Sequence, residues 1–133
     1  MPQFKGAYAA IPASDFERAK SWWADSVGLK PTEEFDQGAY YVVGTTRFLL
    51  YPSQFAGTNK ATAMTLEVDD VRAAVTELRG NGVEFQEYDL PEVKTEEGVA
   101  TWEEGGRKVE AAWCIDSEGN IIALGTPSGF DQI

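Results

Sequence analysis

The sequence predicts an α+β fold in which two paired βαβββ modules form a curved mixed sheet around a cleft, with the helices on the outer face. Two observations predict it: "IPASDFERAKSWW" (11–23) resembles "LEVDDVRAAVTEL" (66–78) in pattern, and three strand-like segments follow each stretch. Four strands in one module cannot bury both faces alone, so we expect the modules to pack together. We therefore assign a single domain to residues 1–133, with modules at about 3–53 and 61–126.

The first module begins with a strand that ends near Ala13, followed by a helix with an N-cap pair at Ser14 and Asp15. Ser14 and Glu17 fit a capping box. The helix carries an apolar stripe at Phe16, Ala19, Trp23 and Val27, and Gly28 ends it. The expected strands are "LKPTEEF" (29–35), "AYYVV" (39–43) and "RFLLY" (47–51).

The second module repeats this order. Its helix begins after Asp69 and Asp70, and its apolar stripe is Val71, Ala74, Val75 and Leu78. The expected strands are "VEFQEYD" (83–89), "KVEAAWCI" (108–115) and "IIALG" (121–125). Asp116 and Gly119 suit the first and fourth positions of a type I turn between the last two strands. Residues 90–106 have no counterpart of matching length in the first module and read as a long inserted loop.

The composition excludes several classes of function. The chain has no histidine, which removes His-dependent catalysis and His-containing metal sites, so a hard-metal site would need carboxylates alone. Its net charge of −11 disfavours nucleic-acid binding. No apolar run is long enough for a membrane helix and no signal peptide is evident, so we expect a cytoplasmic protein. The single cysteine, Cys114, lies in "AAWCI" and is expected to be a buried, inert thiol.

The paired modules, the opening "SDFERAKSWWADSVGL" and the ending "DSEGNIIAL" resemble the vicinal oxygen chelate superfamily. That superfamily includes glyoxalases, extradiol dioxygenases and bleomycin-resistance proteins. The resemblance implies metal-ligand positions at Tyr8, at about Leu50, at Ala63 and at Ala123. Three of these side chains cannot bind a metal, and a lone tyrosine does not suffice. We therefore expect the metal-free branch of the family, with no cofactor and no metal-dependent activity.

The candidate ligand-binding residues are those expected to line the cleft. Tyr8 offers a hydroxyl, Glu67 a carboxylate on the strand face shared with Ala63, and Trp102 a ring that stacks on a flat ligand. The full set is Tyr8, Ala10, Tyr41, Leu50, Ala63, Glu67, Trp102, Trp113 and Ala123, with no catalytic residue assigned. Strand parity leaves open which face Tyr41 and Trp113 occupy, because a shift of one residue reverses the choice.

The first hypothesis for the function is a homodimeric protein that binds a small organic ligand, without turnover, in an apolar cleft with an acidic rim. The rim is the acidic run between Glu84 and Glu104, which would favour a cationic aromatic ligand; a solvated surface is the plainer interpretation. The alternatives are a metal-independent enzyme that uses Tyr8 and Glu67, and a non-catalytic partner domain with a filled cleft.

Overall fold

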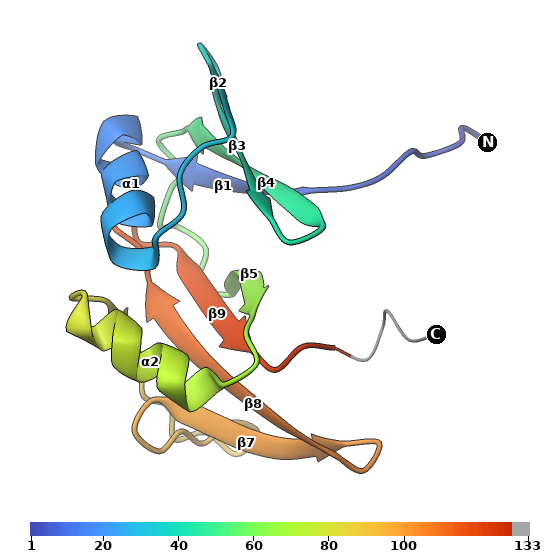
Figure 1. Cartoon of the computed structure of the whole chain (residues 1–133), viewed down its shortest axis with the longest axis vertical. Helices are drawn as coiled ribbons and strands as arrows, with labels where there is room; N and C mark the ends of the chain where they lie inside the picture. Colours follow the sequence, from blue (N-terminus) through green and yellow to red (C-terminus); the bar gives the residue numbers. More distant parts are fainter. Residues whose placement is uncertain (129–133) are drawn as a thin grey trace.

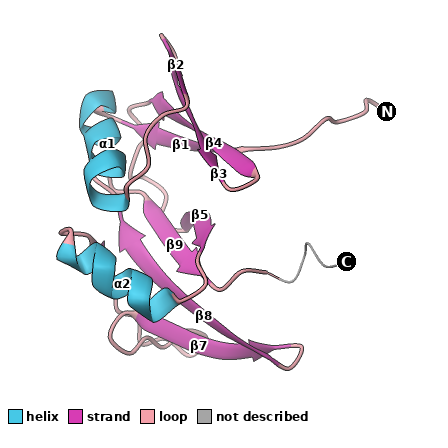
Figure 2. Cartoon of the chain, viewed as in Figure 1, coloured by secondary structure: helices cyan, strands magenta, loops and turns pink. Residues whose placement is uncertain are grey.

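Two mixed β-sheets, each with its own helix, follow one another along the chain in a computed structural model that describes residues 1–128 (Figures 1 and 2). The first sheet contains β1 (Ala9–Ala13), β2 (Glu33–Phe35), β3 (Gly38–Val43) and β4 (Thr46–Pro52), in the order β1-β4-β3-β2. The second contains β5 (Thr62–Glu67), β6 (Glu84–Phe85), β7 (Val99–Glu104), β8 (Arg107–Ile115) and β9 (Ile121–Gly125), in the order β5-β9-β8-β6, with β7 also paired to β8.

Each sheet starts with one parallel pair and continues with antiparallel ones. The parallel pairs are β1–β4 and β5–β9, and the order βαβββ appears in both halves as predicted, with β7 added in the second. The α+β class is confirmed. The sequence suggested one curved sheet, whereas no β-ladder joins the two sheets within residues 1–128; their edge strands β1 and β5 only approach each other.

The two helices lie on the same side of the sheets (Figure 2). Helix α1 (Phe16–Trp22) continues into a π-helical turn, η1 (Trp23–Val27), which stops at Gly28 with φ 82°. Helix α2 spans Val71–Gly80. Neither is long and apolar enough to cross a membrane, and residues 1–128 contain no other helix.

The helix caps correct one detail of the prediction. Asp15 is the N-cap of α1 and accepts a hydrogen bond from the Arg18 backbone N–H at 3.0 Å, as Asp70 does from Ala73 in α2. The predicted capping box of Ser14 and Glu17 is wrong, because the Ser14 hydroxyl donates instead to Glu118, about a hundred residues further along the chain.

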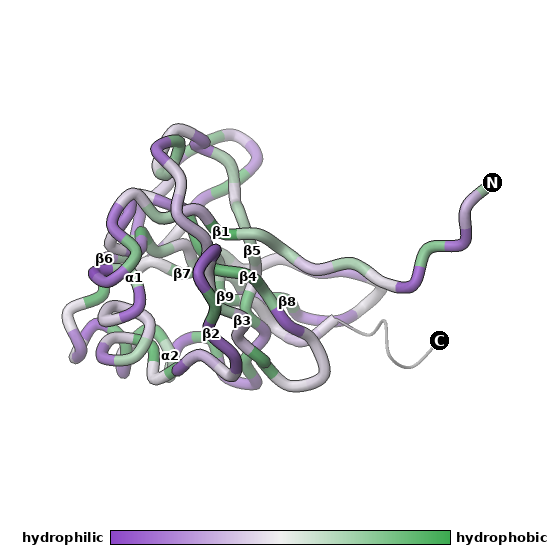
Figure 3. Tube along the Cα trace, turned by 90° about the horizontal axis from the view of Figure 1, so that it is seen from above, coloured by the Kyte–Doolittle hydropathy of each residue, from purple (hydrophilic) through white to green (hydrophobic). Residues whose placement is uncertain are grey.

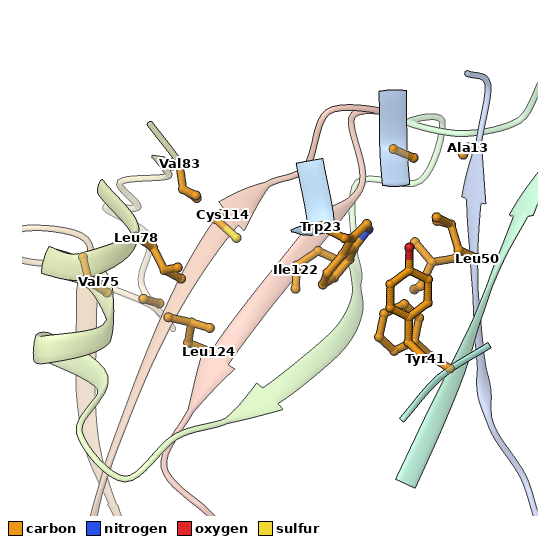
Figure 4. Packing of buried hydrophobic residues seen from close by; sticks show 14 of the residues in the cluster. Ala13, Trp23, Tyr41, Leu50, Val75, Leu78, Val83, Cys114, Ile122 and Leu124 are labelled. Carbon is orange, nitrogen blue, oxygen red and sulfur yellow. The ribbon is translucent and has the colours of Figure 1, made fainter. Parts of the chain in front are cut away.

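A continuous cluster of buried side chains fills the space between the sheets and the helices (Figure 4). In the first half the Trp23 ring packs between α1 and the sheet, 5.0 Å from Phe48, and Tyr41 stacks on Phe48 at 4.8 Å. In the second half Cys114 and Leu124 face α2. Cys114 is buried as predicted, and this burial raises the pKa of its thiol to about 12.

The segment predicted as a long inserted loop, 90–106, contains strand β7. β7 pairs antiparallel with β8, with Trp102 opposite Val109, and Gly105 and Gly106 make the connection at φ 56° and 81°. A two-residue turn with both φ angles positive joins antiparallel strands without splaying them, and glycine adopts it without strain. The pair "GG" was the turn signal that the loop interpretation overlooked.

The turn between β8 and β9 reaches across to the first module. The Glu118 side chain has no exposed surface, and it accepts hydrogen bonds from the Asp15 backbone N–H at 2.8 Å and from the Ser14 hydroxyl at 3.0 Å. Arg18 adds two contacts, from Nε at 2.8 Å and from a terminal guanidinium nitrogen at 3.0 Å. Ser117 also donates to Glu118, at 2.8 Å. Burial alone would raise the pKa of Glu118, but the hydrogen bonds from Arg18, Asp15, Ser117 and Ser14 outweigh it and lower the pKa to about 2.

Two further contacts hold the same turn against the first module and the linker. The Asn120 side-chain amide donates to the Pro12 carbonyl at 2.8 Å and to the Asp116 carboxylate at 2.9 Å. Gly57 of the linker lies so close to the turn that a Cβ there would be 2.7 Å from the Glu118 carbonyl oxygen. The predicted turn is present, with the Gly119 N–H donating to the Asp116 carbonyl at 3.2 Å, and it also joins the two modules.

We expect Glu118→Gln to lower the free energy of unfolding at pH 7 by about 1.5–3 kcal/mol, the range for a hydrogen bond to a charged group. Because the folded pKa of about 2 lies below the ordinary 4.5, this contribution is complete above pH 4.5 and disappears as the pH falls towards 2. Urea titrations of both proteins from pH 7 to pH 2 measure the difference. Glu17→Gln is the control, since the Glu17 carboxyl is 77% exposed and Lys20 is its one ion-pair partner among residues 1–128. An equal loss in both variants would contradict the assignment.

We expect Tyr41→Phe to leave stability unchanged or to raise it by up to about 1 kcal/mol. Tyr41 is fully buried, and its hydroxyl has no hydrogen-bond partner among the described residues, so the native state carries a desolvation cost that phenylalanine removes. The midpoint of urea unfolding measures this. A loss of more than about 1 kcal/mol would show that the hydroxyl is satisfied in solution.

Candidate functional site

A cleft of about 1150 Å³ opens between the two sheets, lined by segments of both modules. The first module contributes the residues before β1 and the β3–β4 hairpin, and the second contributes faces of β5, β7, β8 and β9. The second-sheet face that lines it points away from α2: Ile122 and Leu124 belong to the helix-side core, and Ala123 between them lines the cleft. The N-terminal segment extends from the side of the molecule opposite the helices (Figure 3).

Five of the nine predicted ligand-binding residues line this cleft: Tyr8, Glu67, Trp102, Trp113 and Ala123. Trp113 pairs with Ala123 across β8 and β9, so both side chains share the cleft face, which settles the parity left open by the sequence. The Trp113 indole N–H donates to the Thr62 hydroxyl at 3.1 Å, and this holds the ring in place. Trp102, 39% exposed, donates from its indole N–H to Glu104 at 2.8 Å.

Tyr41 and Leu50 do not line the cleft, and their predicted placement is wrong. Both are fully buried in the core beneath α1: the face of Tyr41, which strand parity left open, is the core face, and Leu50 lies on the same face. Leu50 pairs with Ile11 of β1, another residue of that core. Tyr40 points the other way, and its hydroxyl reaches Tyr8.

Ala10 and Ala63 are exposed and also lie outside the cleft lining. Ala63 falls at an irregularity in β5, between Thr62 and Met64, where the register against β9 shifts. Counting alternate residues along the strand fails at such a bulge, because the extra residue has no partner on the neighbouring strand. Glu67 lies beyond the bulge, where the regular alternation holds.

The predicted acidic rim is not at the cleft. Of the acidic residues between Glu84 and Glu104, only Glu104 lines the cleft in the described part of the chain. Successive side chains of a strand point to opposite faces, so Glu103 points to the other face of the β7–β8 hairpin from Glu104, where it lies opposite Lys108 in the strand register. Glu87 turns into its own loop, where hydrogen bonds from the Thr95 hydroxyl and the Gly98 backbone N–H lower the pKa of its carboxyl.

Sequence reasoning missed an arginine in the cleft. The guanidinium carbon of Arg47 lies 4.9 Å from the centre of the Tyr8 ring and 5.6 Å from that of Tyr40. The Tyr40 hydroxyl donates to the Tyr8 hydroxyl at 3.3 Å, and this hydrogen bond is the main reason that the pKa of Tyr40 is raised. The sequence signal that could have identified Arg47 is the alternation of side chains along β4. Arg47 is next to Phe48, whose side chain is buried in the core beneath α1, so Arg47 points to the opposite face of the strand, toward the cleft.

A family model described as the Glyoxalase/Bleomycin resistance protein/Dioxygenase superfamily matches residues 6–100. The chain belongs to this superfamily. The match runs from the residues before β1 into β7 and therefore includes every strand and helix of the first module and part of the second module. No curated protein matches the chain in sequence.

Solved structures of the superfamily share the fold. The chain is similar to a glyoxalase/bleomycin resistance protein/dioxygenase from Alicyclobacillus acidocaldarius, with a TM-score of 0.68, 14% identity and coverage of 92% of this chain and 90% of that one. It is also similar to a lactoylglutathione lyase from Agrobacterium tumefaciens, with a TM-score of 0.63, 17% identity and coverage of 95% and 96%. At these identities the likeness describes the fold alone.

The positions where superfamily metal enzymes are expected to place ligands do not fit a divalent ion in this chain. Tyr8 supplies one phenol, Ala63 and Ala123 supply methyl groups, and Leu50 is buried in the core. Residues 1–128 contain no group of three or more histidine, cysteine, aspartate or glutamate side chains arranged to hold a metal ion. Hard divalent ions need several oxygen ligands, which these four side chains do not offer.

Proposed function

We propose that this superfamily member is a metal-free protein that binds a small organic molecule in its cleft without converting it, as bleomycin-resistance-type proteins are expected to do. The observation that carries the proposal is a cleft of about 1150 Å³, with Trp102 and Trp113 in its lining and Ala123 at a position where metal enzymes of the family carry a ligand. Clefts of roughly this size, with apolar walls and a few polar groups, suit organic ligands.

The shape of the floor favours a ligand with a flat apolar part. Ala123 is small and lies beside Trp113, whose ring is fixed by its contact with Thr62 and by an edge contact with Tyr88 at 5.5 Å. A ring already held in one orientation loses little entropy when a ligand stacks on it. A cationic ligand has less support than the sequence suggested, because most of the acidic residues between Glu84 and Glu104 lie outside the cleft lining.

We further propose that the protein acts as a homodimer in the cytoplasm. The first sheet leaves apolar side chains exposed on the face away from α1, including Phe35 and Val42, which are 42% and 53% exposed. Exposed apolar side chains on one sheet face favour association, and a second copy of the chain would cover them at the mouth of the cleft.

A ligand should raise the melting temperature of the protein in a saturable way. We expect thermal-shift screening of neutral, cationic and acidic aromatic compounds to find such a ligand, and native mass spectrometry to show one bound per subunit of a dimer. Ala123→Leu fills the floor beside Trp113 and should weaken binding at least about tenfold. Ala73→Leu, on the exposed face of α2, is the control and should bind normally. Turnover of the bound compound, or no ligand from the whole screen, would contradict the proposal.

Divalent metals should have no specific site. We expect the purified protein to contain less than stoichiometric manganese, iron, nickel and zinc by elemental analysis, and its melting temperature to be the same with and without a chelator, because a bound metal stabilises the folded state by mass action. A stoichiometric metal whose removal destabilises the protein would overturn the metal-free assignment.

A further inference from the structure

All but one of the charged side chains that line the cleft have an ion-pair or hydrogen-bond partner within residues 1–128. Glu67 accepts a hydrogen bond from the Ser128 backbone N–H at 2.7 Å, and Glu104 accepts one from the Trp102 indole at 2.8 Å. Glu110 pairs with Arg72 at 2.8 Å, and Arg107 donates to the Pro127 carbonyl at 3.1 Å. Arg47 alone among them has neither an ion pair nor a hydrogen bond within residues 1–128.

Arg47 is nevertheless held in place. Its guanidinium lies over the rings of Tyr8 and Tyr40, at 4.9 and 5.6 Å from their centres. A ring face attracts a cation without neutralising it, whereas a carboxylate would pair with it and occupy its donors. The positive charge and the planar N–H donors of Arg47 are therefore positioned, and no described residue pairs with them, so they can bind a ligand.

The adjacent tyrosine supplies a further donor. Because the Tyr40 hydroxyl donates to the Tyr8 oxygen at 3.3 Å, the hydrogen of Tyr8 is left to point elsewhere, and it has no acceptor among the described residues. A hydroxyl beside a guanidinium provides two kinds of donor to one anion, a combination that suits the two oxygens of a carboxylate.

We propose that Arg47 and the Tyr8 hydroxyl form an anion subsite, and that the ligand of the cleft is an aromatic organic acid whose carboxylate binds there. The inference rests on the proposed ligand-binding function and names its ligand class. The aromatic part of the ligand occupies the region lined by Trp102 and Trp113. The net charge of −11 repels anions at a distance, but salt screens that field beyond about 8–10 Å, so the donors in contact with the ligand decide its binding.

The test compares aryl acids with their neutral amides: phenylacetate with phenylacetamide, 1-naphthylacetate with its amide, and indole-3-acetate with its amide. Calorimetric or NMR titration measures each affinity. We expect at least one acid to bind about ten times more tightly than its amide, since a charge-assisted hydrogen bond favours the acid by this order. Arg47→Gln should weaken the acid about 10–100-fold and change the amide less than about twofold.

Arg107→Gln is the matched control. It makes the same change in net charge at the same cleft, but Arg107 is engaged by the Pro127 carbonyl, so the preference for the acid should persist. Tyr8→Phe should reduce the acid preference several-fold and leave the amide unaffected.

Three outcomes would overturn the subsite. If Arg47→Gln weakens acid and amide alike, Arg47 maintains the shape of the cleft and does not bind the carboxylate. If Arg107→Gln removes the preference for the acid as strongly as Arg47→Gln does, the preference comes from the total charge of the cleft and not from a contact with Arg47. If no acid is preferred over its amide, the ligand class is wrong, although binding of neutral or cationic compounds in the wider screen would still support the proposed function.

Discussion

A single carboxylate without exposed surface lies at the centre of the contact between the two halves of this protein. Glu118 comes from the second module, yet all but one of its hydrogen bonds come from the start of α1 in the first. Because the two sheets share no ladder of backbone hydrogen bonds in the described chain, side-chain contacts of this kind, together with the shared core, fix their relative orientation. The cleft is lined by both modules, so its shape depends on the position of a turn that lies outside its lining.

The sequence predicted well what local patterns control. Helix positions, the glycine that ends η1 and the Asp116–Gly119 turn follow from residues close together in the chain. The placement of Tyr41 and Leu50 failed because the buried face of their hairpin is set by packing against α1 and β1, which lie far away in the sequence, and Ala63 failed because a bulge interrupted the alternation. Ser14 looked like a cap until its partner, Glu118, was known.

The charge of the cleft was the property least accessible from sequence. The acidic run is conspicuous in the sequence, but hairpin pairing and loop hydrogen bonds direct most of it away from the cleft. Arg47 is inconspicuous in the sequence and becomes important only through its two aromatic neighbours. In a protein where three of the four positions expected to hold a metal carry aliphatic side chains, a guanidinium held by ring faces is a different way of placing positive charge in the same fold.

The linker between the modules and the β3–β4 hairpin that borders the cleft are constrained to different degrees. At Gly57 of the linker an added Cβ would meet the backbone of the β8–β9 turn, whereas at Gly44 it would meet nothing within 4 Å, so only the positive φ of 59° favours glycine there. During divergence of such proteins, changes in the cleft hairpin that keep this backbone conformation can accumulate without disturbing the junction between modules, while the linker is held close to the β8–β9 turn. The fold thereby separates the part that can evolve new ligand preferences from the part that preserves the architecture.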